Sequence, residues 1–329
     1  MLTILSVPKA FRGHIATIQR NAITSWTRLR PHPEIILFGD EEGTAAITSK
    51  LGLRHAPALA VNENGAPLLD DLLRRGQQLA SNHLLCYVNA DIILIREWMG
   101  ALEKVGSRID KFLVVANRIN VDVREPIAFG AEWDNSQKGQ LLARGEVGPH
   151  TAIDVFAFPK GTYPQVPPFA IGRLWFDQWF IKAARLNGVP VVDVSRVAPA
   201  LHQNHDYNHV SGGTNWVWQG KEAARNLQFY GEAPHTFTLL DATHELTLDG
   251  RFERVFFRKQ RFAAKQLLWE IFVRRPFPLR KRLGLWHGMR GVCRKARVRR
   301  MSGGDQRTEN RRFGETAEEH DKTLRQRFD

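Results

Sequence analysis

The sequence predicts an α/β fold in which helices flank a mostly parallel β-sheet. Two patterns carry this prediction. Short apolar runs rich in β-formers recur along the chain, and stretches with apolar residues at helical spacing follow them. Three such strand–helix units precede residue 83. Because parallel strands need a long crossover between them, this alternation favours a parallel sheet with right-handed connections.

The expected elements follow one another along the chain. Strands are expected at 2–7, 34–39, 53–59, 84–88, 111–115, 151–159 and 189–194. Helices are expected at 14–29, 42–52, 67–82, 97–105 and 175–186. Residues 131–148 are polar and glycine-rich without a clear period, so no element is assigned to them.

The positive charge of the chain is concentrated at its end. The 329 residues carry a formal net charge of +13, yet residues 251–329 alone hold 23 Lys and Arg against 9 Asp and Glu. The rest of the chain is nearly neutral, which argues against nucleic acid as a partner. We expect one domain over 1–250, a basic amphipathic helical extension over 251–300 and a disordered tail over 301–329.

The extension has two interpretations. From Phe252 onward, aromatic and aliphatic residues alternate with Arg and Lys, so that 252–300 could lie on an anionic membrane surface or form a helical cap on the domain. No apolar run reaches the length of a membrane span. Cys86 and Cys293 give no disulfide framework, which fits a reducing compartment. We expect a cytoplasmic protein, with the inner face of the plasma membrane as a candidate surface.

The stretch from His83 to Ile95 organises the expected fold. The apolar run Leu84–Val88 ends in Asn89-Ala90-Asp91, and a second apolar run follows at once. A carboxylate in this position is costly to bury without a partner. Asp91 therefore either caps a turn or holds a divalent cation that carries substrate phosphates.

This stretch resembles the donor half of GT-A-fold glycosyltransferases, which have a Rossmann-like sheet. In that class a strand ends in an Asp-x-Asp motif that holds Mn²⁺ or Mg²⁺ against the diphosphate of a nucleotide sugar. By resemblance, Asp91 takes the second position, and Asn89 replaces the first Asp, keeping an oxygen donor but losing a charge.

Asp177 begins an expected helix and is surrounded by aromatic residues. It is either a first-turn Asp favoured by the helix dipole or a general base in an apolar pocket. The resemblance implies the second role, because inverting GT-A enzymes place an acidic residue at the start of a helix facing the site.

The run from Leu201 to His209 holds three His and one Asp within eight residues. Its polar groups either bond the backbone of a loop or bind a metal ion. By resemblance, His202 or His205 completes the metal shell; a zinc site is the alternative, without a fitting Cys partner.

Other candidates are less specific. Asp154 lies inside an apolar stretch and, by resemblance, binds sugar hydroxyls, unless it is paired structurally. The remaining candidates for contacts with the nucleotide sugar are Ser6 in the loop 6–9, Asp40 at a strand end, Arg74 on the helix before the metal strand, and Arg173 in the loop before Asp177.

The resemblance, which covers roughly residues 1–230, implies a metal-dependent, inverting transfer of a sugar from a nucleotide-diphosphate donor to a hydroxyl of a glycan or a lipid-linked saccharide. One alternative is a sugar-nucleotide pyrophosphorylase, although the loop after the first strand holds a single Gly. Another is a glycosyltransferase-like scaffold that has lost catalysis and binds a partner or a membrane.

Overall fold

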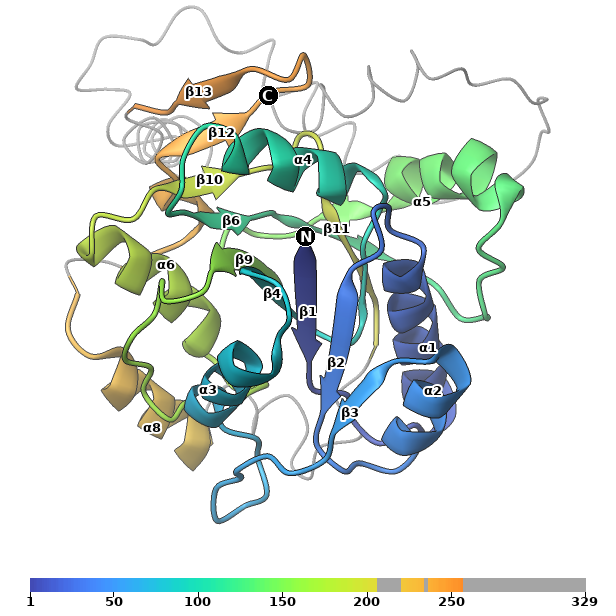
Figure 1. Cartoon of the computed structure of the whole chain (residues 1–329), viewed down its shortest axis with the longest axis horizontal. Helices are drawn as coiled ribbons and strands as arrows, with labels where there is room; N and C mark the ends of the chain where they lie inside the picture. Colours follow the sequence, from blue (N-terminus) through green and yellow to red (C-terminus); the bar gives the residue numbers. More distant parts are fainter. Residues whose placement is uncertain (206–219, 234–235, 257–329) are drawn as a thin grey trace, which may run out of the picture. The chain divides into compact units, whose positions relative to one another are not determined.

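The structure is a computed structural model, shown in Figure 1, that describes residues 1–205, 220–233 and 236–256. Residues Met1–Phe256 belong to one compact unit. The expected tail and all but the first residues of the expected extension lie outside the described residues, so both stay predictions. Within the described part of the chain, no helix is long and apolar enough to cross a membrane.

A nine-stranded sheet forms the centre of this unit (Figure 1). Its strands are β1 (Leu2–Ser6), β2 (Glu34–Phe38), β3 (Arg54–Ala56), β4 (Leu84–Val88), β6 (Leu113–Val115), β9 (Val155–Pro159), β10 (Val191–Asp193), β12 (His244–Leu246) and β13 (Phe252–Arg254). Their spatial order is β13-β12-β10-β6-β9-β4-β1-β2-β3. Neighbours are parallel except at β9, which runs antiparallel to β4 and β6, and at the edge strand β13.

Alternate side chains of the central strands enter two apolar cores, one on each face of the sheet. In β4, Cys86 and Val88 enter one core, whereas Leu85 and Tyr87 enter the other. Successive side chains of a strand point to opposite faces, so a strand buried on both faces is apolar throughout. This burial explains the uninterrupted apolar runs in the sequence.

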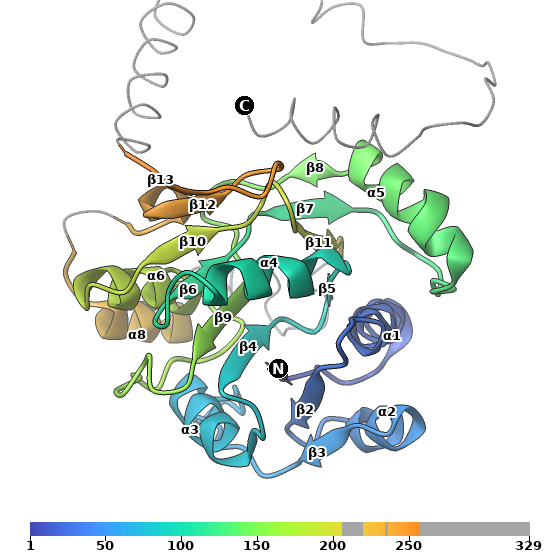
Figure 2. The ribbon, with the colours of Figure 1, turned by 45° about the horizontal axis from the view of Figure 1, so that its top comes forward.

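Helices cover both faces (Figures 1 and 2). The core that holds Cys86 is covered by α1 (Gly13–Thr27), α2 (Thr44–Leu51), α4 (Glu97–Gly106) and α5 (Lys138–Arg144). The core that holds Tyr87 is covered by α3 (Leu69–Leu79), α6 (Phe176–Leu186) and α8 (Lys221–Tyr230). The predicted α/β class, a mostly parallel sheet flanked by helices, is therefore confirmed.

A second, smaller sheet lies beside α1 and α5 (Figure 2). It consists of β5 (Ile92–Ile93), β11 (Ala200–Gln203), β7 (Arg118–Val121) and β8 (Glu146–Val147), in that spatial order. The indole nitrogen of Trp26 donates a 2.9 Å hydrogen bond to the carbonyl of Ile92, which ties this sheet to α1. Through β11 the small sheet carries His202 toward the turn that follows β4.

Several expectations are wrong in detail. No strand was expected at β7 or β11, although both pair within the second sheet. Residues 131–148, left unassigned, contain a π-helical turn, η1 (Trp133–Gln137), then α5 and β8. The expected helical extension does not begin at Phe252, because Phe252–Arg254 pairs with β12 as β13. A three-residue alternation of large and charged side chains satisfies a strand as well as a helix.

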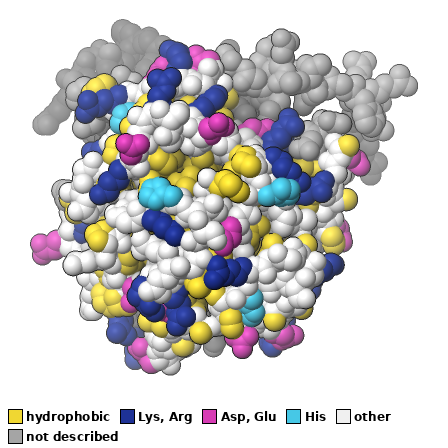
Figure 3. Space-filling model, in the orientation of Figure 1, with side chains coloured by type: hydrophobic (Ala, Val, Ile, Leu, Met, Phe, Trp, Pro, Cys, Tyr) yellow, Lys and Arg dark blue, Asp and Glu magenta, His cyan; other side chains and the backbone are white. Residues whose placement is uncertain are grey.

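The surface shown in Figure 3 carries Lys and Arg interspersed with Asp and Glu. The described part of this face therefore has no extended area of a single charge sign, in keeping with the nearly neutral composition of the first 250 residues.

Candidate active site

The candidate site forms where β1 and β4 end side by side. The two strands are parallel, with Leu5 opposite Tyr87, and the Ser6 hydroxyl donates a 2.6 Å hydrogen bond to the carbonyl of Val88. Ligands of open α/β sheets bind at the carboxyl ends of the strands. Ser6 is completely buried and holds the two strand ends together, so its side chain serves the sheet.

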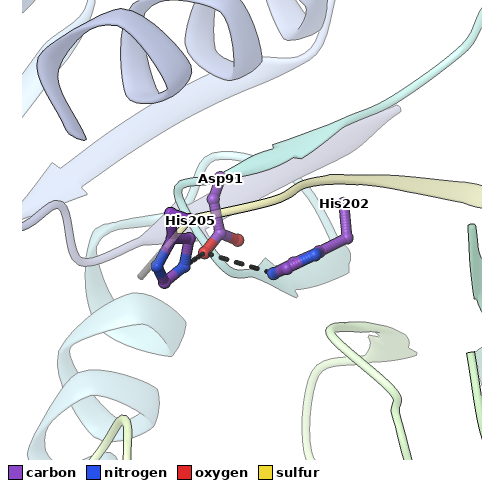
Figure 4. A group of neighbouring side chains, drawn as sticks. All are labelled: Asp91, His202 and His205. Atoms are coloured by element: carbon purple, nitrogen blue, oxygen red, sulfur yellow. Dashed lines mark hydrogen bonds and ion pairs between the residues drawn. The ribbon is translucent and has the colours of Figure 1, made fainter. Parts of the chain in front are cut away.

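Asp91 lies between two histidines in the turn that links β4 to β5 (Figure 4). Its Oδ2 is 3.1 Å from Nε2 of His205 and 3.9 Å from Nε2 of His202. One ligand atom from each of the three residues lies within 4.8 Å of the others. We call these three residues the Asp91 cluster; the structure thus unites residues more than 110 positions apart in the sequence.

The electrostatics of the Asp91 cluster favour metal-binding protonation states. Burial raises the pKa of Asp91, but the hydrogen bond with His205 and the nearby charge of Lys9, among other interactions, outweigh it, so this pKa is lowered. Burial lowers the pKa of His202 against the opposing charge of Asp91, which favours the neutral ring. Ionised carboxylate and neutral imidazole are the forms that bind metals.

The Asp91 cluster fits a divalent metal ion. Oδ1 of Asp91 and Nδ1 of His202 are buried and have no hydrogen-bond partner among the described residues. Buried polar atoms are rarely left without a partner, and an ion is one explanation for an exception. Protein ligands lie about 2.0–2.2 Å from such metals, so two ligands of one ion lie at most about 4.4 Å apart. The two separations from Asp91 satisfy this limit.

A buried amide network positions the Asp91 cluster. Gln203 lies between the two histidines in sequence and is completely buried. Its Nε2 donates to the carbonyls of Ile18, at 2.8 Å, and Asp91, at 3.0 Å. Its Oε1 accepts a 3.0 Å hydrogen bond from Asn21 on α1. Gln203 therefore fixes the backbone at both Asp91 and the end of β11.

Gln203→Leu is expected to lower the free energy of unfolding by about 1–3 kcal/mol, because buried partners lose their hydrogen bonds. It should also weaken Mn²⁺ binding, since the carbonyl of Asp91 is released. Urea denaturation and Mn²⁺ titration measure the two effects. Exposed Gln140→Leu is the control and should change neither. Unaltered Mn²⁺ affinity in a destabilised Gln203→Leu would show that the network is structural only.

Asp154, directly before β9, is held by two partners. Its Oδ1 accepts a 2.8 Å hydrogen bond from Nδ2 of Asn89, and its Oδ2 lies 3.2 Å from NH1 of Arg118. Oδ1 of Asn89 in turn accepts a 2.8 Å hydrogen bond from the hydroxyl of Tyr87. Both ends of the Asn89 amide are thus used within the protein. The structure thus shows Asn89 as an anchor for Asp154, and its expected role as a metal ligand stays a prediction.

Asp177 lies in the first turn of α6. Its Oδ2 accepts a 3.0 Å hydrogen bond from Nε2 of Gln178, whereas its buried Oδ1 has no partner among the described residues. Burial raises the pKa of Asp177 to about 7, assisted by the nearby charge of Asp154 and opposed by Arg118. A carboxyl group with a pKa near 7 is suited to take up a proton at neutral pH.

The backbone before α6 is strained. Trp175 has φ of 87°, in the left-handed region that bulky residues rarely adopt. Its ring packs against Tyr230, with ring centroids 5.3 Å apart. Strained residues of this kind cluster at functional sites, and this one lies two positions before Asp177.

The remaining predicted residues lie outside this arrangement or at its edge. Asp40 is exposed after β2. Arg74 hydrogen-bonds to Asp71, because residues three positions apart in a helix lie next to each other on its surface. Arg173 donates a 2.7 Å hydrogen bond from Nε to buried Glu222, yet its charge acts on Lys9. Of the four less specific phosphate or nucleotide candidates, Ser6 and Arg173 lie near the site.

Sequence reasoning missed two residues of β7. Arg118 reaches Asp154, and Asn120 lies opposite His202 across the β7–β11 pair. Oδ1 of Asn120 is buried without a partner among the described residues. The polar–apolar alternation of Arg118-Ile-Asn-Val121 was the available signal, because it is typical of a half-buried strand with one polar face.

No family model matches the chain, and the comparison with curated proteins found no match. Among solved structures, the chain is similar to glucosyl-3-phosphoglycerate synthase from Mycobacterium tuberculosis in complex with Mn²⁺, UDP and glucosyl-3-phosphoglycerate. The TM-score is 0.41 at 13% identity, covering 78% of this chain and 87% of the other.

The chain is also similar to a protein from Desulfovibrio desulfuricans G20 assigned as a nucleotide-diphospho-sugar transferase, with TM-score 0.38, 11% identity, and coverage of 68% and 92%. The match to S. aureus TarS 1–349 has TM-score 0.37 and 10% identity and covers 62% of this chain and 57% of the other. All three TM-scores lie below 0.5, so the function proposed below rests on this chain's own residues.

Proposed function

We propose that this protein is a metal-dependent, inverting glycosyltransferase that uses a nucleotide-diphosphate sugar. The observation that carries the proposal is the pairing of two features at one end of the sheet. One is the Asp91 cluster, in which Oδ1 of Asp91 is buried and has no partner among the described residues. The other is Asp177, a carboxyl group whose pKa is raised to about 7. Both carboxyl groups act electrostatically on Tyr87 of β4, which supports a shared site.

The proposed reaction is a single displacement. Asp91, His202 and His205 would hold Mn²⁺ or Mg²⁺, which stabilises negative charge on the diphosphate when bound. Asp177 takes the proton from the acceptor hydroxyl as its oxygen forms a bond to the anomeric carbon. The bond from that carbon to the diphosphate oxygen breaks, and its electron pair stays on the diphosphate. Attack opposite the leaving group inverts the anomeric centre.

A thermal-shift panel tests the proposal. UDP-, GDP-, dTDP- and CMP-sugars are each added with and without Mn²⁺. The proposal expects stabilisation by one nucleotide-diphosphate class that requires Mn²⁺ and is lost in Asp91→Ala, because specific ligands stabilise the folded state by mass action. Indifference of the folded protein to every donor would favour the inactive scaffold. Formation of a nucleotide sugar from a nucleoside triphosphate and a sugar phosphate would favour the pyrophosphorylase.

Mn²⁺ should be preferred over Mg²⁺. Two of the three protein ligands are imidazole nitrogens, whereas Mg²⁺ prefers oxygen ligands and keeps its water. Half-maximal activation is therefore expected at a Mn²⁺ concentration at least about tenfold below that of Mg²⁺. Metal titrations of donor binding after treatment with a chelator measure this preference. Equal or better support by Mg²⁺ would contradict the proposed ligand set.

A further inference from the structure

Lys9 leaves the sheet beside Asp91. The parallel register of β1 and β4 pairs Leu5 with Tyr87, and the Ser6 hydroxyl bonds to the end of β4. Lys9 follows Leu5 by four residues, and Asp91 follows Tyr87 by four residues. Matched strand ends thus place a cation and the central carboxylate of the Asp91 cluster at the same edge.

A side chain of α1 fixes the backbone of Lys9. The N–H of Lys9 donates a 2.6 Å hydrogen bond to Oε1 of Gln19, and Nε2 of Gln19 donates a 2.7 Å bond to the carbonyl of Lys9. Gln19 is 2% exposed, so its amide is committed to this contact. A surface lysine has no need of such an anchor. The paired hydrogen bonds fix the backbone from which the Lys9 side chain leaves, just beyond β1.

The ammonium group of Lys9 has no anion of its own. It makes no hydrogen bond or ion pair with the described residues, because Asp154 is taken by Arg118 and Asn89, and Asp91 by His205. Burial lowers the pKa of Lys9, while the charges of Asp91 and Asp154 raise it and that of Arg173 lowers it. A half-buried cation with distant rather than bonded carboxylates is suited to an anionic ligand.

Counting charges identifies that ligand. Asp154 and Arg118 neutralise each other. A divalent ion, Asp91 and Lys9 would together carry two positive charges, and the diphosphate of a nucleotide sugar carries two negative charges; ionised Asp177, the proposed base for the acceptor, is counted with the acceptor. We propose that Lys9 binds the diphosphate of the donor and selects a nucleoside diphosphate over a nucleoside monophosphate. This inference rests on the proposed function.

Inorganic pyrophosphate is a probe that requires no knowledge of the nucleoside. Calorimetry follows Mn²⁺ binding first and pyrophosphate binding to the Mn²⁺-loaded protein second, for wild type, Lys9→Met, Lys9→Arg and the exposed control Lys50→Met. Lys9→Met should bind pyrophosphate about 10- to 100-fold more weakly, the worth of one charge-assisted hydrogen bond. It should bind Mn²⁺ at least as tightly as wild type, because a neighbouring positive charge is gone. Lys9→Arg should retain most of the pyrophosphate affinity, and Lys50→Met all of it.

In Lys9→Met, weaker pyrophosphate binding combined with Mn²⁺ binding at least as tight as in wild type distinguishes a role in phosphate binding from damage to the Asp91 cluster. Weakened binding of both Mn²⁺ and pyrophosphate in Lys9→Met would overturn the phosphate role, since it would mean that Lys9 supports the Asp91 cluster. Unchanged pyrophosphate affinity would overturn it as well and leave the proposed function standing. A wild-type protein that binds Mn²⁺ but no pyrophosphate, or neither, would overturn both proposals.

Discussion

Replacing Asp177 with Asn is expected to lower kcat by about 10²- to 10⁴-fold, the range for loss of a general base. Affinity for Mn²⁺ and for the donor should stay within about twofold, because Asp177 contacts neither of them in the proposed reaction. Once the donor panel has supplied a substrate, initial rates and calorimetry measure the two quantities. Exposed Asp110→Asn is the matched control and should behave as wild type.

The raised pKa gives this prediction two further signatures. In wild type, kcat/KM should rise as pH rises through about 7, because only the ionised form of Asp177 accepts a proton.

The stability of the folded protein should also depend on Asp177. Ionising this buried carboxyl group costs free energy in the folded state, whereas in the unfolded chain its pKa is about 3.8. That cost grows between pH 3.8 and 7 and is constant above, so Asp177→Asn should be more stable at pH 8, by about 2–4 kcal/mol. Turnover that survives in Asp177→Asn would remove the general base from the account.

Replacing Asp91 with Ala is expected to weaken Mn²⁺ binding by about 100-fold or more. Mutating a residue that only orients a metal ligand already lowers metal affinity by about 10- to 100-fold. Asp91 would itself be a ligand, and it is the only carboxylate of the Asp91 cluster. Its loss also leaves two imidazoles without their shared partner. Mn²⁺ titration monitored by electron paramagnetic resonance measures the affinity without any donor. His202→Ala and His205→Ala should each weaken binding in the same direction, and Asp110→Asn should not.

Metal affinity that is equal in Asp91→Ala and wild type would mean that the ion binds elsewhere or not at all. The reading of Asp91 as a turn cap would then be the better one. A loss of stability without any change in metal affinity would point the same way.

The sequence predicted the central sheet because its strands are buried on both faces. Leu84–Val88 is an uninterrupted apolar run, Leu2–Ser6 is mostly apolar and completely buried, and α1 and α3 follow the apolar spacing of helices packed on one side. The antiparallel direction of β9 left no trace in the sequence, because burial on two faces looks the same in either direction.

The candidate site was predictable where chemistry was concentrated in sequence. Asp91 followed a strand, Asp177 began a helix, and His202 and His205 stood in a dense polar cluster. Contacts that depend on register were not visible. Arg118 meets Asp154, and Lys9 emerges beside Asp91, only because distant strands align. Conversely, Arg74 looked suited to phosphate but pairs within its own helix.

The coupling between metal and nucleotide binding tests the central claim most directly. Calorimetry with the nucleoside diphosphate of the preferred donor class, with and without Mn²⁺, gives the coupling factor, and reciprocity requires the same factor for Mn²⁺. The account predicts at least about tenfold tightening in wild type and in Asp177→Asn, and none in Asp91→Ala. Absence of coupling in wild type, or its persistence in Asp91→Ala, would contradict a diphosphate-binding metal centre at Asp91.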